Sequence, residues 1–447
     1  MNVSRYNVYY DSLAPGGVVV FNTLSRGIAA IDPDLACALR GAQGEAGDKA
    51  ELEAILSMEE VTELQRCGVL VGDALDELSA LQYSFRETRF QTADMQVQIL
   101  FSSQCNFACE YCYQDTLTST HNMSMPQWAA VLACLKATAE TSGVKRLEAI
   151  LFGGEPLVNP DVVLKAATDL KQLESAGVKV KSVLVTNGSL LTTKLLRGLE
   201  ASVDTVQITI DGPQDRHDRL RHFVDGRGSF AAVMRALDLT MQSALPNVVV
   251  RTNFAPGDVD TVRGFINSLA TELEDPQRVQ MSFASIAPML SERFMAQGVP
   301  PDTEGLRTSI TLQGEAVRAG FAGGQASRVF PSGSCSARKP NSLVVDQDLN
   351  VFKCPLQMPN NACAEILADG SLVVKAEPWY ALPNEIPECV FSCVYGPICG
   401  GGCPLSSFTP ERGKEGCEYR DHTALRIETT LRERLRSTEP HPREVHA

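Results

Sequence analysis

The sequence predicts an α/β fold, flanked by a small N-terminal module and a cysteine-rich C-terminal domain. Between Thr92 and Ala322, six apolar runs rich in β-branched residues alternate with amphipathic stretches. This pattern is typical of parallel strands joined by right-handed helical crossovers. Eleven of the fourteen cysteines fall in two groups, one directly after the first strand and one beyond the last helix. With 447 residues, the chain can bury a large core in two or three domains.

The spacing of apolar residues predicts the strands and helices of the central region. Strands are expected at 95–101, 147–152, 178–186, 205–210, 248–253 and 279–285, and helices at 126–141, 160–176, 192–199, 229–241, 259–273 and 303–319. The first cysteine group leaves the end of the first strand. We therefore expect it at the carboxyl edge of the sheet, where open α/β sheets and barrels carry their chemistry.

The first 91 residues are predicted to form a separate module with a helical linker. Two β-rich runs flank the turn Pro15-Gly-Gly, which predicts a hairpin. Helical patterns and a closing strand follow, so the expected elements are a hairpin of 6–11 and 18–23, helices at 33–40, 50–56 and 58–67, a strand at 68–71 and a linker helix at 76–90.

Composition limits the partners and the compartment. Forty basic and fifty-four acidic side chains give a formal charge of −14, which argues against broad binding to nucleic acid or an anionic membrane. No signal peptide or membrane span is recognisable, so we expect a cytoplasmic protein. Clustered cysteines in a reducing compartment usually bind metal. The remaining three, Cys37, Cys67 and Cys134, are expected to be small core residues.

The first cysteine group reads Cys105-Asn-Phe-Ala-Cys109-Glu-Tyr-Cys112. Three thiolates ligate three irons of a cubane cluster and leave the fourth open to a non-protein ligand. A structural zinc site would need a fourth ligand, for which His121 is the only near candidate. Zinc and unligated core cysteines are the alternatives.

The spacing of Cys105, Cys109 and Cys112, with the aromatic Tyr111 before the third, resembles the radical S-adenosylmethionine (AdoMet) superfamily. The resemblance implies a partial (β/α)6 barrel whose open side admits a large substrate. It also implies that the three cysteines hold a catalytic 4Fe-4S cluster whose free iron is chelated by AdoMet, with Tyr111 near the cofactor. An electron, expected from a flavodoxin or ferredoxin, then cleaves AdoMet to a 5′-deoxyadenosyl radical that abstracts hydrogen from the substrate.

The motif after the second strand is Gly153-Gly154-Glu155-Pro156. Two glycines let a backbone approach a ligand closely. In the family that this chain resembles, the motif binds the methionine ammonium of AdoMet, which makes Glu155 the charged partner.

Residues after the third and fourth strands extend the resemblance. Asn187 lies in a loop similar to the family's ribose-side loop, although Asn-Gly is also a common turn. Thr209 and the following Arg221 resemble the pair that helps to hold AdoMet, and a guanidinium suits its carboxylate. The alternative is that Asp211 caps a turn and Arg221 pairs with a surface acid.

The second cysteine group resembles the SPASM extension of radical AdoMet enzymes, which carries two auxiliary 4Fe-4S clusters. The stretch has little periodicity and several prolines, so ligation is expected to hold it together. The resemblance assigns three cysteines to the first auxiliary cluster and four to the second, which makes three clusters in the protein: Cys335, Cys354 and Cys403, then Cys389, Cys393, Cys399 and Cys417.

Two departures from the SPASM pattern matter. The gap between Cys389 and Cys393 is one residue longer than usual. The fourth ligand of the first auxiliary cluster is either Cys363 or absent, and in some relatives that make thioethers a vacant iron is thought to bind the substrate thiol. Structural zinc is again the alternative.

The predicted domains are 1–91, a possible leader-peptide module; 92–325, the barrel; 326–436, the SPASM domain with a helix at 424–435; and 437–447, a disordered tail. A hairpin with three helices is similar to winged-helix-like elements on peptide-modifying enzymes, where a leader peptide adds a strand. The leading interpretation is a maturase that forms a thioether or carbon-carbon cross-link in a ribosomal peptide. The alternatives are an anaerobic sulfatase maturase, although Pro355 occupies the position of the expected aspartate base, and a non-catalytic peptide-binding scaffold.

Overall fold

The computed structural model describes residues 1–14, 16–43, 50–112, 114, 121–286, 302–323, 335–358, 361–376, 379, 386–404 and 417–438. The last residues of the predicted tail lie outside this set. Thr438, which was expected in that tail, is the last residue of helix α16 (Glu418–Thr438).

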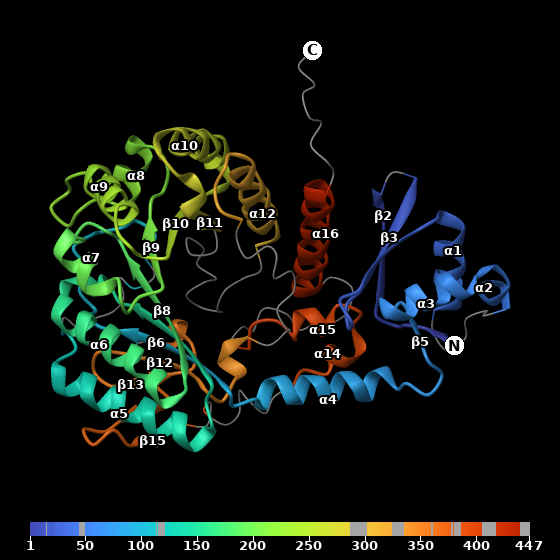
Figure 1. Ribbon diagram of the computed structural model, residues 1–447, viewed down its shortest axis with the longest axis horizontal. Helices are drawn as coiled ribbons and strands as arrows, with labels where there is room; N and C mark the ends of the chain where they lie inside the picture. The colour runs from blue at the N-terminus through green and yellow to red at the C-terminus, as the bar shows by residue number, and fades with distance from the viewer. Residues whose placement is uncertain are drawn as a thin grey trace, which may run out of the picture.

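Six parallel strands form the main part of a ten-stranded sheet. They follow the order of the chain, and their bounds agree with the predictions to within one residue: β6 (Asp94–Leu100), β7 (Arg146–Phe152), β8 (Lys179–Thr186), β9 (Thr205–Thr209), β10 (Asn247–Phe254) and β11 (Val279–Ser285). The helices that connect them lie along the outside of the curved sheet (Figure 1). They are α5 (Met125–Ser142), α6 (Pro160–Gln172), α7 (Thr193–Leu199), α8 (Gln214–Leu220), α9 (Phe230–Met241) and α10 (Val259–Glu272), with α12 (Thr303–Arg318) after the last strand.

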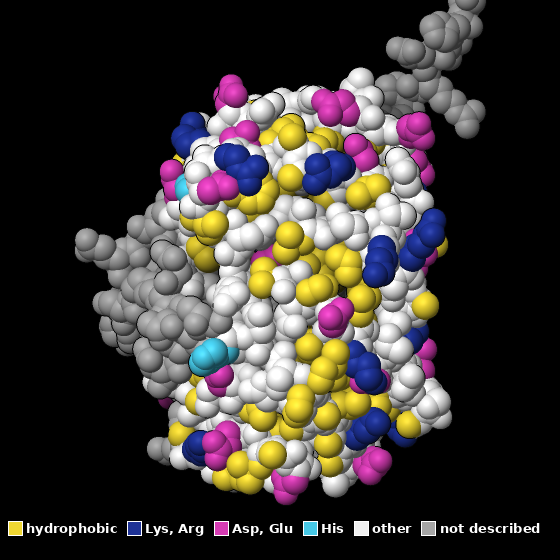
Figure 2. Space-filling model, turned by 90° about the vertical axis from the view of Figure 1, so that its left-hand side faces the viewer, with side chains coloured by type: hydrophobic (Ala, Val, Ile, Leu, Met, Phe, Trp, Pro, Cys, Tyr) yellow, Lys and Arg dark blue, Asp and Glu magenta, His cyan; other side chains and the backbone are white. Residues whose placement is uncertain are grey.

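Apolar and polar residues alternate along β6, which gives the sheet two different faces. Met95, Val97 and Ile99 are buried in the main apolar core, whereas Gln96 and Gln98 alternate with them and are partly exposed. Successive side chains of a strand point to opposite faces, so the apolar set meets the helices and the polar set faces the inside of the sheet. On the helical outer surface, acidic and basic side chains are interspersed among hydrophobic ones (Figure 2).

The C-terminal part extends the barrel sheet. Strand β12 (Ser342–Val345) pairs in parallel with β6, and the antiparallel strands β13 (Asn350–Phe352), β14 (Ala364–Ile366) and β15 (Leu372–Val374) continue from it. Strands β12 and β13 form a hairpin, and Leu349 takes a left-handed conformation with φ 68° in its turn. The predicted domain limit between 325 and 326 therefore separates strands that share one sheet.

The N-terminal module contains the predicted hairpin and three helices. Strands β2 (Asn7–Ala14), β3 (Gly17–Asn22) and β4 (Ile28–Ile31) form an antiparallel sheet, while β1 (Asn2–Val3) pairs with β5 (Leu70–Val71). The helices are α1 (Pro33–Ala42), α2 (Ala50–Ile55), α3 (Met58–Arg66) and the linker α4 (Glu77–Phe90). The sequence did not indicate β1 or β4. Cys67 and Cys134 are buried as expected, but Cys37 is exposed, so its assignment to the core was wrong.

Helix α16 joins the parts of the molecule. It contacts α12 and β2, and lies between the barrel and the N-terminal sheet (Figure 1). Ile427 and Leu431 share an apolar cluster with Val19 and Phe21 of β3. Within the described residues, no helix combines the length and hydrophobicity that a membrane crossing requires.

Candidate active site

The cysteine triplet lies on the loop that leaves β6, as predicted. Cys105 and Cys109 are partly buried and Cys112 is exposed. Burial, with a smaller contribution from the neighbouring thiols of the triplet, raises the pKa of Cys105 to about 11 and that of Cys109 to about 12. Such thiols stay protonated near neutral pH unless a metal displaces the protons, and metal binding is coupled to this deprotonation.

The chain after α8 holds this loop in place. The Ala108 N–H donates to the His222 carbonyl at 2.9 Å, and the Glu110 N–H donates to the Leu220 carbonyl at 3.1 Å. Phe107 contacts Phe223 edge to face, with ring centroids 4.9 Å apart. The triplet is therefore fixed to the same segment that carries Arg221.

The two glycines after β7 pack against the chain that leads into the triplet. The Gly154 N–H donates to the Ser102 carbonyl at 2.8 Å. A Cβ at Gly153 would lie 2.5 Å from the Ser102 carbonyl oxygen, and one at Gly154 would lie 2.5 Å from that of Gln104. Glycine is required here for this close approach of two chain segments. Contact of either glycine or of Pro156 with AdoMet stays a prediction.

Glu155 is fully buried, and both of its carboxylate oxygens accept hydrogen bonds from the protein itself. Oε1 accepts from Thr186 Oγ1 at 2.7 Å and from the Leu157 N–H at 3.0 Å, while Oε2 accepts from the Asn187 N–H at 2.7 Å. Burial nevertheless raises its pKa. Glu155 thus joins the ends of β7 and β8, and its predicted contact with the ammonium of AdoMet would come in addition to these bonds.

Asn187 connects the end of β8 to the cysteine loop. Its Nδ2 donates to Asn106 Oδ1 at 2.8 Å and lies 3.9 Å from Cys105 Sγ. Its Oδ1 accepts from the Ser189 N–H at 2.9 Å. Thr209 is buried at the end of β9. Both residues lie at the carboxyl edge of the sheet, where the sequence placed them.

Arg221 is buried near the triplet rather than paired with a surface acid. Its Nη1 donates to the Tyr111 hydroxyl at 2.7 Å, and its charge lowers the pKa of Cys109. Its Nε is buried and has no hydrogen-bond partner. A buried guanidinium with an unpaired donor fits an anionic ligand, so the residues present here fit a carboxylate-bearing cofactor such as AdoMet.

His121 does not act as a fourth ligand in this structure. Its Nδ1 lies 3.8 Å from Asp348 Oδ1, and 76% of its side chain is exposed. Among the described residues, no three His, Cys, Asp or Glu side chains are arranged to hold a single metal ion.

Four cysteines of the second group surround one cavity. Cys389, Cys393, Cys399 and Cys417 line it together with Gly396, Gly401, Tyr419 and Arg420. The first three cysteines lie in and around the short helices α14 (Cys389–Ser392) and α15 (Gly396–Cys399), and Cys417 directly precedes α16. These are the four residues predicted for the second auxiliary cluster, and a cavity between four thiols fits such a group.

The predicted ligands of the first auxiliary cluster also come together. Burial, with a smaller contribution from the nearby thiols of Cys335 and Cys403, raises the pKa of Cys354 to about 12. The buried Lys353 donates Nζ to the carbonyls of Lys339 and Pro340, at 2.9 and 2.8 Å. This lysine ties the strand before Cys354 to the segment after Cys335.

Cys363 has a different environment. It is fully buried, its thiol lies 3.4 Å from the Val351 carbonyl, and the nearby charge that acts on it is Lys353. We therefore expect the Cys363→Ala variant to retain all of its iron and its auxiliary paramagnetic signals, measured anaerobically beside a Cys354→Ala variant that loses part of them. Loss of an auxiliary signal in Cys363→Ala would restore Cys363 as a ligand.

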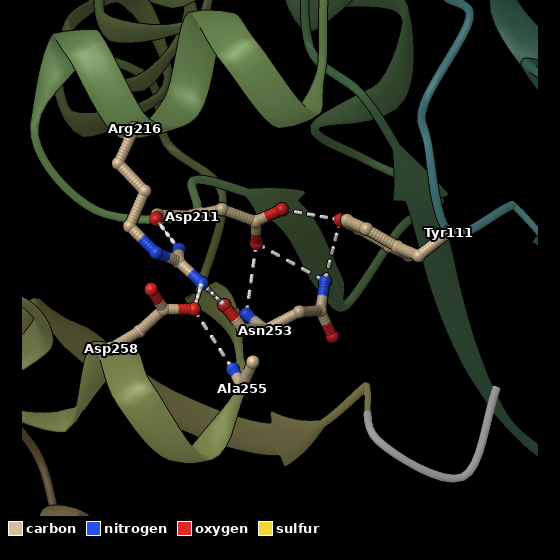
Figure 3. Close-up of polar contacts among 6 residues, drawn as sticks. All are labelled: Tyr111, Asp211, Arg216, Asn253, Ala255 and Asp258. Carbon is tan, nitrogen blue, oxygen red and sulfur yellow. Dashed lines mark hydrogen bonds and ion pairs between the residues drawn. The ribbon is translucent and has the colours of Figure 1, made fainter. Parts of the chain in front are cut away.

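Two functional candidates escaped the sequence analysis. Asp211, which was considered only as a turn cap, and Asn253 at the end of β10 both contact the Tyr111 hydroxyl (Figure 3). Asp211 directly follows one predicted strand and Asn253 is the last residue of the next, and this position was the only signal that the sequence offered.

Comparisons with known proteins agree with this geometry. Residues 99–267 match the model of the radical SAM superfamily. A serine-type anaerobic sulfatase-maturating enzyme of Bacteroides thetaiotaomicron is 30% identical over 138 residues, which cover 30% of this chain and 33% of that enzyme. The radical SAM cyclopropyl synthase TigE of Paramaledivibacter caminithermalis is 24% identical over 218 residues, or 43% of this chain and 44% of that enzyme. The chain thus spans less than half of the length of these curated relatives.

Solved structures share the fold over more of the chain. The structure of anSMEcpe with bound AdoMet has a TM-score of 0.58 and 17% identity, and covers 77% of this chain and 98% of its own. Streptococcus suis SuiB bound to precursor peptide SuiA has a TM-score of 0.52 and 12% identity, and covers 90% of this chain and 95% of its own. The matched model, the triplet and the sheet together identify residues 99–267 as a radical SAM domain.

Proposed function

We propose that this chain is a radical AdoMet maturase that forms a thioether or carbon-carbon cross-link in a ribosomally synthesised peptide. The observation that carries the proposal is the cavity lined by Cys389, Cys393, Cys399 and Cys417, in a chain that also has a radical SAM domain. An iron-sulfur extension of this kind accompanies peptide modification in the SPASM enzymes that the sequence resembles.

In this proposal, Cys105, Cys109 and Cys112 hold the cluster that binds AdoMet. Bound there, AdoMet and a reduced cluster supply a 5′-deoxyadenosyl radical. The guanidinium of Arg221 binds the carboxylate of AdoMet, while Asn187 keeps the loop around Cys105 in place. The inner face of the sheet, which carries the partly exposed Gln96 and Gln98 and an apolar cluster that includes Leu100 and Phe152, is proposed to admit the peptide.

The proposal includes two auxiliary clusters and a flavodoxin or ferredoxin as the reductant. The grouping of Cys335 and Cys403 around Cys354, without Cys363, supports a first auxiliary cluster with three protein ligands. Its fourth iron would then be free to bind the thiol of a substrate cysteine, which favours a thioether over a carbon-carbon bond. A cytoplasmic location belongs to the same proposal, because reducing conditions keep these thiols available.

The N-terminal module is proposed to bind the leader part of the peptide in the manner of a winged-helix-like element. In its three-stranded sheet, β2 and β4 each pair with β3 on one side only, as far as the described residues show. An outer strand offers unpaired N–H and C=O groups to an added peptide strand. The SuiB structure with its precursor peptide covers 90% of this chain.

A second candidate is an anaerobic sulfatase maturase, which converts Cys or Ser to formylglycine. The named relatives of this class favour it. Against it stands Pro355, directly after Cys354, where those enzymes are expected to carry an aspartate base. Proline has no side-chain group that accepts a proton, so we rank this candidate second.

The test uses the full-length protein, reconstituted with iron and sulfide under anaerobic conditions and reduced with dithionite. We expect it to cleave AdoMet to 5′-deoxyadenosine, measured by chromatography. Synthetic peptides that contain cysteine but no serine should then lose the mass of two hydrogen atoms and retain their sulfur, because a thioether forms with loss of one hydrogen from sulfur and one from carbon, and a carbon-carbon bond forms with loss of one hydrogen from each carbon. Loss of sulfur would instead identify formylglycine formation. No cleavage by fully loaded protein would leave only the scaffold interpretation.

A further inference from the structure

The hydroxyl of Tyr111 is the meeting point of three residues from other parts of the barrel. It donates to Asp211 Oδ2 and accepts from Arg221 Nη1 at 2.7 Å and from Asn253 Nδ2 at 3.0 Å. A phenolic oxygen has one proton and two lone pairs, so these three bonds use its full capacity. Tyr111 lies between Cys109 and Cys112, and its hydroxyl therefore links the cysteine loop to the ends of β9 and β10 (Figure 3).

Asp211 is the anion in this group. It is fully buried, and its Oδ1 accepts from the Asn253 N–H at 2.8 Å and from Asn253 Nδ2 at 3.1 Å. A buried carboxylate is tolerated only where hydrogen bonds and an opposite charge compensate for lost hydration. The compensating charge is Arg221, which shares the Tyr111 hydroxyl with Asp211 and whose pKa Asp211 helps to raise.

The backbone around Asp211 is held from a second side. Arg216 donates to the Asp211 carbonyl, to the Asn253 carbonyl at 3.0 Å and to Asp258 Oδ2 at 2.7 Å, and Asp258 also accepts from the Ala255 N–H at 3.0 Å (Figure 3). These bonds fix the ends of β9 and β10 relative to each other. The carboxylate of Asp211 is thus a rigid anchor for the Tyr111 hydroxyl.

A directed chain of hydrogen bonds also joins the backbones of Asp211 and Arg221. The Asp211 N–H donates to His217 Nδ1 at 3.1 Å, so Nε2 carries the imidazole proton and donates to Ser229 Oγ at 2.9 Å. The Ser229 hydroxyl in turn donates to the Arg221 carbonyl. Burial, with the charges of Arg221 and Arg216, lowers the pKa of His217 to about 3. The imidazole is therefore neutral, as this series of hydrogen bonds requires.

We infer that Asp211 is a positioning residue for the AdoMet site, acting through the Tyr111 hydroxyl on the cysteine loop and on Arg221. This inference rests on the proposed function, because it assumes that AdoMet binds beside the triplet. Without the carboxylate, the hydroxyl loses its acceptor and Arg221 loses its counter-charge. The guanidinium and the loop with Cys109 and Cys112 would then no longer be held for the cofactor.

The test is the Asp211→Asn variant, which keeps the size of the side chain. Its amide oxygen can still accept from Asn253, but its NH₂ group then faces the Tyr111 hydroxyl, so two donors oppose each other. We expect the AdoMet dissociation constant to rise about tenfold or more, which corresponds to the loss of one hydrogen bond to a charged group. The paramagnetic signal of the reduced cluster should also respond less to AdoMet, while the iron content stays unchanged.

Two further variants make the outcome decisive. Tyr111→Phe should weaken AdoMet binding in the same way, and the double variant should add little, because both changes break one connection. Asp260→Asn is the matched control, since Asp260 lies on α10 with 95% of its side chain exposed and pairs with Arg263 at 3.0 Å. Wild-type affinity in Asp211→Asn, or in Tyr111→Phe if the first variant does not fold, would overturn the inference. Failure of the wild type itself to bind AdoMet would overturn the proposed function as well.

Discussion

Replacing Cys105, Cys109 and Cys112 together by alanine is expected to abolish the production of 5′-deoxyadenosine. The three side chains lie on one loop, and burial raises the pKa of two of them, so they become thiolates only by binding metal. Without them, no protein ligand of this cluster remains at the site. The measurement is chromatographic detection of 5′-deoxyadenosine after dithionite reduction, together with iron quantification.

The same variant should lose the iron of one cluster and keep the auxiliary iron. The cysteines of the second group lie on other segments, and the four around the cavity near α14, α15 and α16 do not include any of the triplet. Cys37→Ala serves as the control, because Cys37 is an exposed thiol on α1 that has no proposed role. Residual cleavage above the background of the buffer would contradict the assignment of the triplet.

The sequence predicted the barrel well because its signals are local. The parallel strands are short apolar runs that alternate along the chain with helical patterns, and several strand ends carry a polar or glycine-rich motif. The triplet, Glu155, Asn187 and Arg221 were predicted as site residues from such signals, and their contact with a cluster or AdoMet stays a prediction. Their common edge follows from the parallel topology, since the carboxyl ends of such strands meet on one side of the sheet.

What the sequence did not reveal depends on contacts between distant segments. Asp211 and Tyr111 are 100 residues apart, and Asn253 lies 142 residues beyond Tyr111. Nothing in the sequence around these residues shows that Asp211 and Asn253 both contact the hydroxyl of Tyr111. Similarly, the pairing of β12 with β6 joins segments with no shared pattern, so the sequence did not show that the C-terminal part extends the barrel sheet. The role of Glu155 as a buried acceptor for Thr186 and Asn187 is also a consequence of tertiary structure.

We expect that a change in the second group of cysteines will stop peptide modification without stopping AdoMet cleavage. Cys393→Ala removes a buried thiol from the four-cysteine cavity. We expect this variant to lose the iron of one auxiliary cluster and to form no modified peptide, while it still forms 5′-deoxyadenosine. The reason is that the cavity lies near α16 and the N-terminal module, whereas the triplet and Arg221 are held by the loop after β6 and the segment after α8.

The local structure explains why loss of one ligand should have a large effect. Gly400, Gly401 and Gly402 all have positive φ, at 63°, 84° and 73°. A Cβ at Gly401 would lie 2.7 Å from Pro387, and one at Gly402 would lie 2.6 Å from the ring of Tyr419. This tight turn directly after α15 buries few large apolar residues, so metal ligation supplies much of its stability.

The effect should extend to the N-terminal module, because that module contacts the cysteine-bearing segment directly. The Tyr6 hydroxyl donates to the Phe391 carbonyl at 3.4 Å, Thr23 Oγ1 donates to the Val394 carbonyl, and Phe85 contacts Phe391 edge to face. Limited proteolysis of Cys393→Ala should therefore cut the N-terminal region faster than in the wild type or in Cys37→Ala. Unchanged iron and unchanged proteolysis would show that Cys393 is not a ligand. Loss of AdoMet cleavage, with only one cluster missing, would show instead that the two sites depend on each other.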